Sequence, residues 1–202
     1  MSRGQSDKEN QEVYVRFVDI LFAVVLGQSF VVLSSVFRDP KTDAFRLGTI
    51  FVIFALVITS WYGYHHSVKD VPIRSAFRWL IDIMLLFVYY AGFVAASELD
   101  PSNLVFTPIL LVFLGAFSLY SVWDAVRIVE YRSMPEIKTF SLYKRLVESV
   151  AFTIILFAIT AFYLLVIKPQ NVAGTEWGYL VGLTVVLVIY RYVKLHQSAS
   201  NR

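Results

Sequence analysis

Six long apolar segments, separated by short stretches rich in charged residues and proline, make up almost the whole chain. Each has roughly the 20 apolar residues that a helix needs to cross the hydrocarbon core of a bilayer. Turn-forming pairs such as Asp39-Pro40, Asp100-Pro101 and Lys168-Pro169 mark the connections. The pattern therefore predicts six membrane-spanning helices, over residues 17–37, 47–64, 77–96, 104–123, 146–167 and 177–195.

These spans leave only short connections, so the sequence predicts an all-α membrane fold, a bundle of six helices that forms a single transmembrane domain over residues 1–202. The longest connection, residues 124–145, is expected to extend its two flanking helices past the membrane around Pro135. No internal repeat is recognisable in the sequence, which disfavours a secondary transporter built from inverted repeats.

The composition favours the same class of protein. Hydrophobic residues make up 57% of the chain and charged residues 16%, whereas soluble globular domains carry fewer apolar and more charged residues. The chain contains no cysteine, which excludes disulfides and zinc sites built on thiolates. The net charge of +3 is distributed over short connections, so we expect the lipid bilayer, and not nucleic acid, as a partner.

The distribution of lysine and arginine predicts the orientation of the bundle. An even number of spans places both termini on one side of the membrane, and all but four of the 18 Lys and Arg residues fall on that side. The four on the opposite side are Arg38, Lys41, Arg46 and Lys168. Because cytoplasmic connections carry the excess of Lys and Arg, both termini are predicted to be cytoplasmic. The small size and the lack of a targeting signal favour a prokaryotic plasma membrane.

Ionisable side chains inside spans are costly to bury and usually face protein or water. Asp19, Asp82 and Glu148 lie near the cytoplasmic ends of the first, third and fifth spans, and the second span ends on that side with aromatic and histidine residues. We therefore predict an interhelical polar network in this layer. Its members are Asp19, Trp61, Tyr62, His65, His66 and Asp82.

A simpler interpretation of the two aspartates remains open. Asp19 follows Arg16 by three residues and Asp82 follows Arg78 by four, so each could form a local ion pair on its own helix. The adjacent histidines lack the i, i+4 spacing that places two metal ligands on one helix face. The sequence accordingly predicts no metal site and no cofactor.

The first span has two different faces on a helical wheel drawn at about 100° per residue. A narrow stripe lies opposite Asp19, and it consists of Phe17, Ile20, Val24, Gln28, Val31 and Ser35. Aliphatic side chains interrupted by polar ones suit a narrow, mostly dewetted ion pathway. They equally suit close packing against a neighbouring helix.

Three segments carry a resemblance to a known family. They are residues 17–24 (FVDILFAV), residues 62–66 (YGYHH) and residues 79–82 (WLID). They resemble the first three helices of the transmembrane protein 175 family, whose members are potassium-permeable channels of endosomes and lysosomes with six-helix bacterial and archaeal homologues. Val13, Val18 and Asp82 stand where that family has arginine, serine and asparagine.

The resemblance implies both an assembly and a function. It implies a homotetramer in which the first helix of each subunit lines the pore, with Val24, Gln28 and Val31 at the constriction and Ile20 on the same stripe. It also implies that Asp19, the histidines and Asp82 tie the first three helices together. The expected function is therefore a potassium-permeable cation channel.

Two other functions stay open. One is a membrane-embedded enzyme that uses the cytoplasmic-side Asp/His cluster, although the sequence shows no glycine-rich phosphate loop and no nucleophile motif. The other is a structural or adaptor subunit of a larger membrane assembly, which the sparse polar content of the spans permits. Between these, the sequence favours the channel and predicts that the protein is not an enzyme.

Overall fold

Every regular element in the computed structural model is a helix, within the residues that the structure describes, 3–38, 44–70, 75–99, 106–132, 139–168 and 174–200. The elements are α1 (Arg3–Arg38), α2 (Ala44–Asp70), α3 (Ala76–Ser97), α4 (Thr107–Tyr131), α5 (Thr139–Phe162), the π-helical η1 (Tyr163–Ile167), which continues α5, and α7 (Thr175–Ser200).

Six helices are long and apolar enough to cross a membrane, with α5 and η1 counted as one. A continuous helix satisfies its own backbone hydrogen bonds, which is a requirement in lipid, where water is absent. The predicted all-α class with six helices of spanning length is therefore confirmed. Insertion into a membrane and the side on which the termini lie stay predictions.

The fourth helix extends beyond its predicted span into residues 124–131, an extension that the sequence predicts for the helices flanking the longest connection. Its first turn contains Pro108, a position where the missing N–H costs no helical hydrogen bond. The span is predicted to end at residue 123, but α4 continues to Tyr131. Asp124 and Arg127, expected in a connection, therefore belong to a helix of spanning length.

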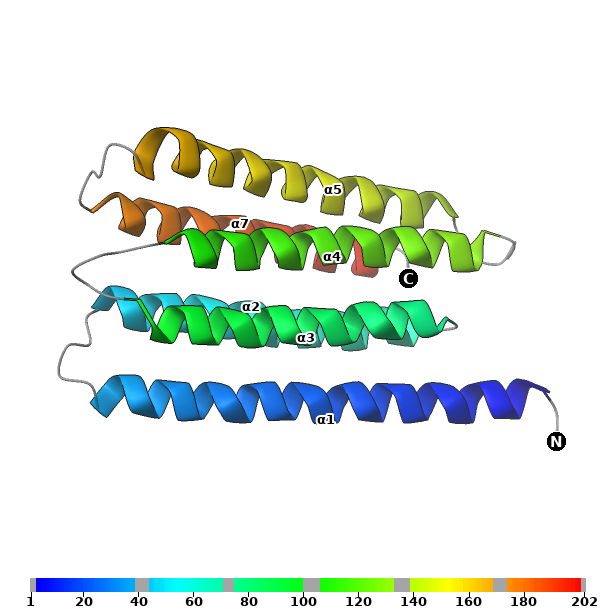
Figure 1. Cartoon of the computed structure of the whole chain (residues 1–202). Helices are drawn as coiled ribbons and strands as arrows, with labels where there is room; N and C mark the ends of the chain where they lie inside the picture. The colour runs from blue at the N-terminus through cyan, green and yellow to red at the C-terminus, as the bar shows by residue number, and fades with distance from the viewer. Residues whose placement is uncertain are drawn as a thin grey trace.

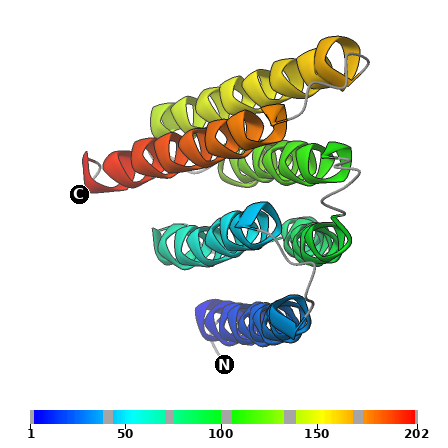
Figure 2. The same cartoon turned by 90° about the vertical axis from the view of Figure 1, so that its left-hand side faces the viewer.

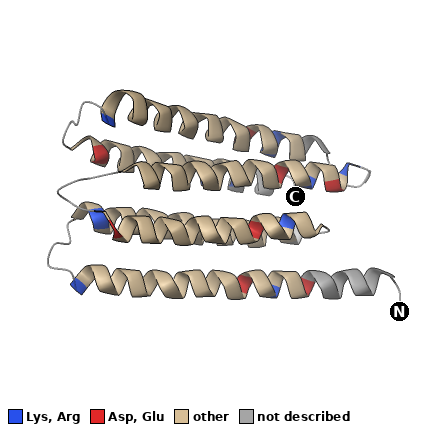
Figure 3. Ribbon diagram, in the orientation of Figure 1, with Lys and Arg blue, Asp and Glu red and all other residues tan. Residues whose placement is uncertain are grey.

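The helices run alternately up and down in four layers (Figures 1 and 2). The outermost layers are α1 on one side and α5 on the other, and between them lie the pairs α2 with α3 and α4 with α7. Because each helix reverses the direction of the one before it, the start of α1 and the end of α7 lie at the same end of the bundle, which we call the termini end. Charged residues gather towards the helix ends and leave apolar middles (Figure 3).

The core is centred on α3 and α4. Tyr89, Phe93, Phe113 and Phe117 are fully or almost fully buried there. Gly92 lets the helices approach closely, because a Cβ at this position would lie 3.0 Å from Val112 Cγ1 and 3.3 Å from Ile53 Cγ2. In lipid there is little hydrophobic driving force between helices, so their association depends on close van der Waals packing. Small residues such as Gly92 allow that close packing.

Candidate functional site

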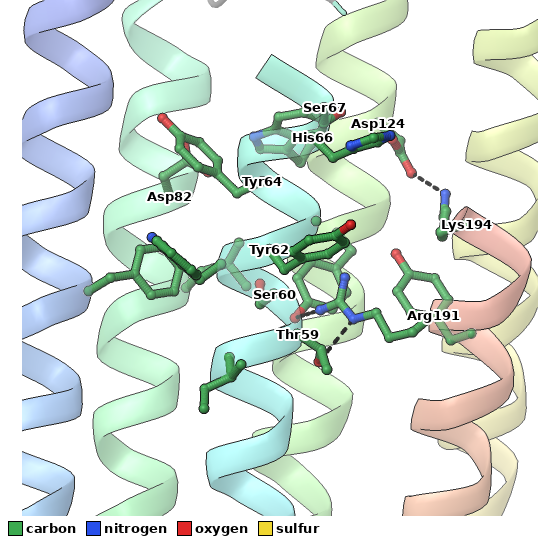
Figure 4. A pocket seen from close by; sticks show the side chains of 18 of the residues that line it. Thr59, Ser60, Tyr62, Tyr64, His66, Ser67, Asp82, Asp124, Arg191 and Lys194 are labelled. Carbon is green, nitrogen blue, oxygen red and sulfur yellow. Dashed lines mark hydrogen bonds and ion pairs between the residues drawn. The ribbon is translucent and has the colours of Figure 1, made fainter. Parts of the chain in front are cut away.

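A cavity of about 300 Å³ lies in the half of the bundle towards the termini end (Figure 4). Its walls come mainly from α2, α4 and α7, and it extends past α2 to Asp82 on α3. Most of its lining is aromatic or aliphatic, but five charged side chains reach it. These are Asp82, Asp124, Arg145, Arg191 and Lys194. Charged groups at this depth are rare in membrane proteins and mark candidate functional sites.

One wall of the cavity holds a buried ion pair between α4 and α7. Lys194 Nζ donates to Asp124 Oδ2 at 2.8 Å, and both side chains are less than a tenth exposed. Ser149 Oγ donates to the same carboxylate oxygen at 2.5 Å, and Lys194 Nζ also donates to the Arg145 carbonyl at 2.6 Å. These additional hydrogen bonds offset part of the cost of removing the two charges from water.

Arg191 occupies the floor of the cavity in a different environment. Its Nε donates to Thr59 Oγ1 at 3.2 Å and its Nη2 donates to Tyr120 OH at 3.0 Å. Its guanidinium carbon lies 5.1 and 5.3 Å from the ring centres of Tyr120 and Tyr190, within the range of cation–π attraction. Gly63 on α2 faces it, and a Cβ there would lie 2.9 Å from Arg191 Nη1.

A chain of hydroxyl groups leads from Arg191 into the core. Tyr120 OH and Tyr89 OH are 2.7 Å apart, and Tyr89 OH donates to Ser60 Oγ at 2.5 Å. The chain joins α7, α4, α3 and α2 in one polar network inside an apolar bundle. Because each buried hydroxyl has a partner, the network adds specific geometry without a large desolvation cost.

A second buried ion pair joins α3 and α4 closer to the termini end. Arg78, whose side chain is fully buried, donates from Nη1 to Glu130 Oε2 at 2.8 Å, and Ser75 N donates to Glu130 Oε1 at 3.0 Å. The Arg78 guanidinium also lies 4.2 Å from the ring centre of Trp123. Arg78 thus binds a carboxylate on a neighbouring helix. The sequence suggests only a local ion pair of Arg78 with Asp82 on the same helix.

Three of the residues predicted to form a polar network lie together between α1 and α2. Asp19 Oδ1 accepts a hydrogen bond from Trp61 Nε1 at 3.1 Å and lies 3.2 Å from His65 Nε2. The rings of Trp61 and His65 are packed with centroids 4.8 Å apart. Arg16, the alternative local partner of Asp19, instead pairs with Glu12 at 3.5 Å on the exposed surface.

The other three predicted network residues lie elsewhere in the same layer. Tyr62 and His66 stack on each other, with centroids 6.2 Å apart, and both line the cavity. Residues 61 and 65 point to one side of α2 and residues 62 and 66 are turned about 100° further round the helix. Asp82 is 4% exposed and lies near Tyr64 (Figure 4), with its Oδ2 atom lacking a hydrogen-bond partner among the described residues.

The stripe predicted on the first span lies on the exposed side of α1. Its members Ile20, Val24, Gln28 and Val31, which we call the outer face of α1, are all exposed in the single chain. The opposite side of the helix packs into the bundle through Val18, Phe22, Val25 and Ser29. In the part of the chain that the structure describes, no three His, Asp or Glu side chains group closely enough to hold a metal ion.

Comparisons of this chain with family models, with curated proteins and with solved structures found no match. The resemblance to the transmembrane protein 175 family therefore stays a prediction.

The sequence pattern missed the cavity because its charged residues looked like orientation signals. Arg145, Arg191 and Lys194 line the cavity, but their charges fit the cytoplasmic excess of Lys and Arg equally well. The same holds for Arg78 and Arg127, which lie outside the cavity and are buried against neighbouring helices, as Lys194 is. Their spacing carried a usable signal. Arg191 and Lys194 are three residues apart beside Tyr190, as are Asp124 and Arg127 beside Trp123, so each pair shares one helix face with an aromatic residue.

Proposed function

We propose that the protein is a cation channel in which the outer faces of α1 from identical copies surround a pore. The observation that carries the proposal is the polar character of the exposed side of α1. Gln28 is exposed near the middle of the spanning segment, and Ser34 and Ser35 are exposed close to the end of the helix at Arg38. A primary amide that faces lipid has no hydrogen-bond partner, so it is stabilised when it faces water or another copy of the protein.

The other outer helices differ from α1 in this respect. Between their ends, the exposed residues described on α5 and α7 are apolar. The large ones are Val147, Val150, Ile154, Ile155, Phe157, Phe162, Val181, Val185, Val188 and Ile189. Such surfaces are compatible with lipid tails. Among these outer helices α1 is therefore the one whose surface fits a protein-lined or water-lined environment.

The contacts of Asp19 support the same assignment by fixing the rotation of α1. Its carboxylate binds the side chains of Trp61 and His65 on α2, so this side of the helix is held against the bundle. The residues opposite, Ile20, Val24, Gln28 and Val31, are consequently presented outward. A pore needs a helix whose orientation is specified in this way, because a few degrees of rotation change which side chains face the axis.

The chemistry of the outer face suits a narrow ion pathway. Val24 and Val31 would form hydrophobic rings that restrict flow by excluding water, as gating constrictions do. Gln28 lies between them, and its amide oxygen offers a neutral ligand to a monovalent cation that has lost part of its hydration shell. Potassium as the ion, four copies as the assembly and a plasma membrane with both termini cytoplasmic are part of this proposal.

Cysteine accessibility tests the proposal directly, because the natural chain contains no cysteine. Gln28→Cys should react with a membrane-impermeant thiol reagent in liposomes, since a pore brings water to this position. Ile154→Cys, near the middle of α5 and also exposed in the single chain, serves as the matched control. It should stay unreactive in lipid. Equal protection of both cysteines would contradict a water-lined α1.

Ion flux tests the channel activity itself. Wild-type protein in liposomes with a potassium gradient should conduct, and Val24→Asp should conduct faster because a carboxylate hydrates the constriction. Ile154→Leu should conduct like the wild type. Absence of flux from folded wild-type protein, in potassium, sodium and proton gradients alike, would refute the proposal.

A further inference from the structure

Arg191, which is partly buried near the end of the spanning part of α7, carries a positive charge that no described carboxylate binds. Its hydrogen-bond acceptors among the described residues are the hydroxyl groups of Thr59 and Tyr120. Of the two carboxylates that line the cavity, Asp124 is occupied by Lys194 and Ser149. The other, Asp82, lies on the far side of α2 (Figure 4). The guanidinium is therefore solvated by neutral dipoles and aromatic rings, and its charge is not matched locally.

A charge of this kind is costly in the interior of a membrane protein. Charged groups in a low-dielectric environment are paired or lie beside water or a ligand. The two nitrogens of Arg191 that donate are Nε and Nη2, so the two hydrogens of Nη1 are not used in any hydrogen bond to the described residues. A guanidinium with unused donors towards a cavity is well suited to bind an oxyanion.

Elsewhere in the cavity lining, hydrogen-bond donors also lack acceptors. Arg145 Nε is a buried donor that lines the cavity and has no hydrogen-bond partner among the described residues, whereas the donor Trp123 Nε1 interacts with the Asp82 carboxylate. Tyr64 OH, which can donate or accept, also has no hydrogen-bond partner among the described residues. The Asp82 Oδ2 atom is a buried acceptor in the cavity lining that likewise has no hydrogen-bond partner among them. Buried polar groups are normally satisfied, so unsatisfied donors indicate a missing acceptor. The charge balance points the same way, because three cationic side chains and two carboxylates line the cavity.

We propose that this cavity binds an anion carrying a carboxylate or phosphate group, with the Arg191 guanidinium as its main contact. A volume of about 300 Å³ is at the small end of ligand pockets, so the ligand is a small molecule or a lipid headgroup. Tyr62, Tyr120 and Tyr190 would contact its apolar part. The site lies inside one subunit and is separate from the outer face of α1, so the proposal does not depend on channel activity.

The wall opposite Arg191 provides a way to test the site without removing the charge. Gly63 leaves the space that the guanidinium occupies, and a Cβ there would come within 2.9 Å of Nη1. Gly63→Ala should therefore displace the end of the flexible arginine side chain while the fold is retained. Gly182→Ala on α7 is the matched control, because a Cβ at that position meets no atom within 4 Å.

The experiment measures binding to purified, delipidated protein in a neutral detergent. The soluble probes are inorganic phosphate and benzoate, and the lipid probes are phosphatidylglycerol and phosphatidylcholine. We expect saturable binding of at least one anionic probe to the wild type and to Gly182→Ala, detected as a rise in the unfolding temperature and by titration calorimetry. Arg191→Gln should weaken this binding at least about tenfold, because a charge-assisted hydrogen bond is lost, and Gly63→Ala should weaken it in the same direction.

The pattern of probes identifies the source of the anion. Binding of phosphate or benzoate indicates a soluble ligand, whereas binding of phosphatidylglycerol without phosphatidylcholine indicates an anionic lipid headgroup. The proposal is overturned if the wild type binds none of the three anionic probes, or if Arg191→Gln and Gly63→Ala both bind as tightly as the wild type. If Arg191→Gln does not fold, the comparison of Gly63→Ala with Gly182→Ala decides.

Discussion

Single residues in this bundle show how charges are accommodated in an apolar interior. Asp124 and Lys194 are each less than a tenth exposed, and they form an ion pair with each other. Asp124 also accepts a hydrogen bond from Ser149, and Lys194 also donates one to the Arg145 carbonyl. Removal of both charges from water is offset only while both partners are present. The pair therefore specifies how α4 and α7 meet, and it contributes less to net stability than its short distance implies.

This balance predicts an asymmetric response to substitution. Lys194→Met leaves the Asp124 carboxylate buried without its counter-charge and should destabilise the protein by about 3–5 kcal/mol. The double variant Asp124→Leu/Lys194→Met should recover most of that loss, because no buried charge remains. The free energies of unfolding of both variants can be measured in detergent. A double variant no more stable than Lys194→Met would show that the pair is not the source of the loss.

At the scale of helices, the distance at which two helices pack depends on where glycine stands in their interface. Gly92 on α3 faces Val112 of α4 and Ile53 of α2, and the space it leaves is filled by both. Gly115 on α4 is different, because a Cβ there would make ordinary contacts of 3.8 and 3.9 Å with Val88. The two glycines thus occupy one interface but have different structural importance.

The contrast gives a matched pair of substitutions. Gly92→Ala inserts a methyl group 3.0 Å from Val112 Cγ1, so it should separate α3 from α4 and destabilise the protein by about 1–3 kcal/mol. Gly115→Ala should be neutral or slightly stabilising, because alanine favours the helix and finds room. Unfolding temperatures of the two variants in the same detergent compare them. Equal values would mean that Gly92 does not control the helix spacing.

At the scale of the whole molecule, the described part of one subunit is closely packed at its centre. Its middle is filled by aromatic residues such as Tyr89, Phe93, Phe113 and Phe117. A pathway for ions would therefore lie between subunits, and a symmetric ring of identical helices is the simplest way to build one. The outer face of α1 is the surface that this arrangement would bring together.

A ring of α1 helices predicts a definite pattern of cross-links. Val24→Cys and Gln28→Cys should form disulfides between copies under mild oxidation, because equivalent residues approach one another around a symmetry axis. With a bifunctional thiol reagent of short length, Gln28→Cys combined with a second cysteine on the same face should give products up to a tetramer. Ile154→Cys on α5 should remain monomeric. Cross-linking of Ile154→Cys alone would place a different helix at the interface.

The class of protein follows from the sequence alone, because the bilayer imposes one-dimensional requirements. The length of each apolar segment predicts a helix, and six such segments predict the six helices of spanning length found among the described residues. The polarity of the outer face of α1 and the proximity of Asp19 to the second span could also be predicted, since both depend on helical periodicity and on a common membrane depth.

The tertiary structure decided which charges meet, because partner choice depends on the rotation of each helix and on which helices are neighbours. Apolar segments of similar length do not encode this order. Asp19 pairs with Trp61 and His65, whereas Tyr62 and His66, one position further along α2, stack on each other. Similarly, only the packing of α7 against its neighbours shows that Lys194 has a carboxylate partner and that Arg191 has none among the residues that the structure describes.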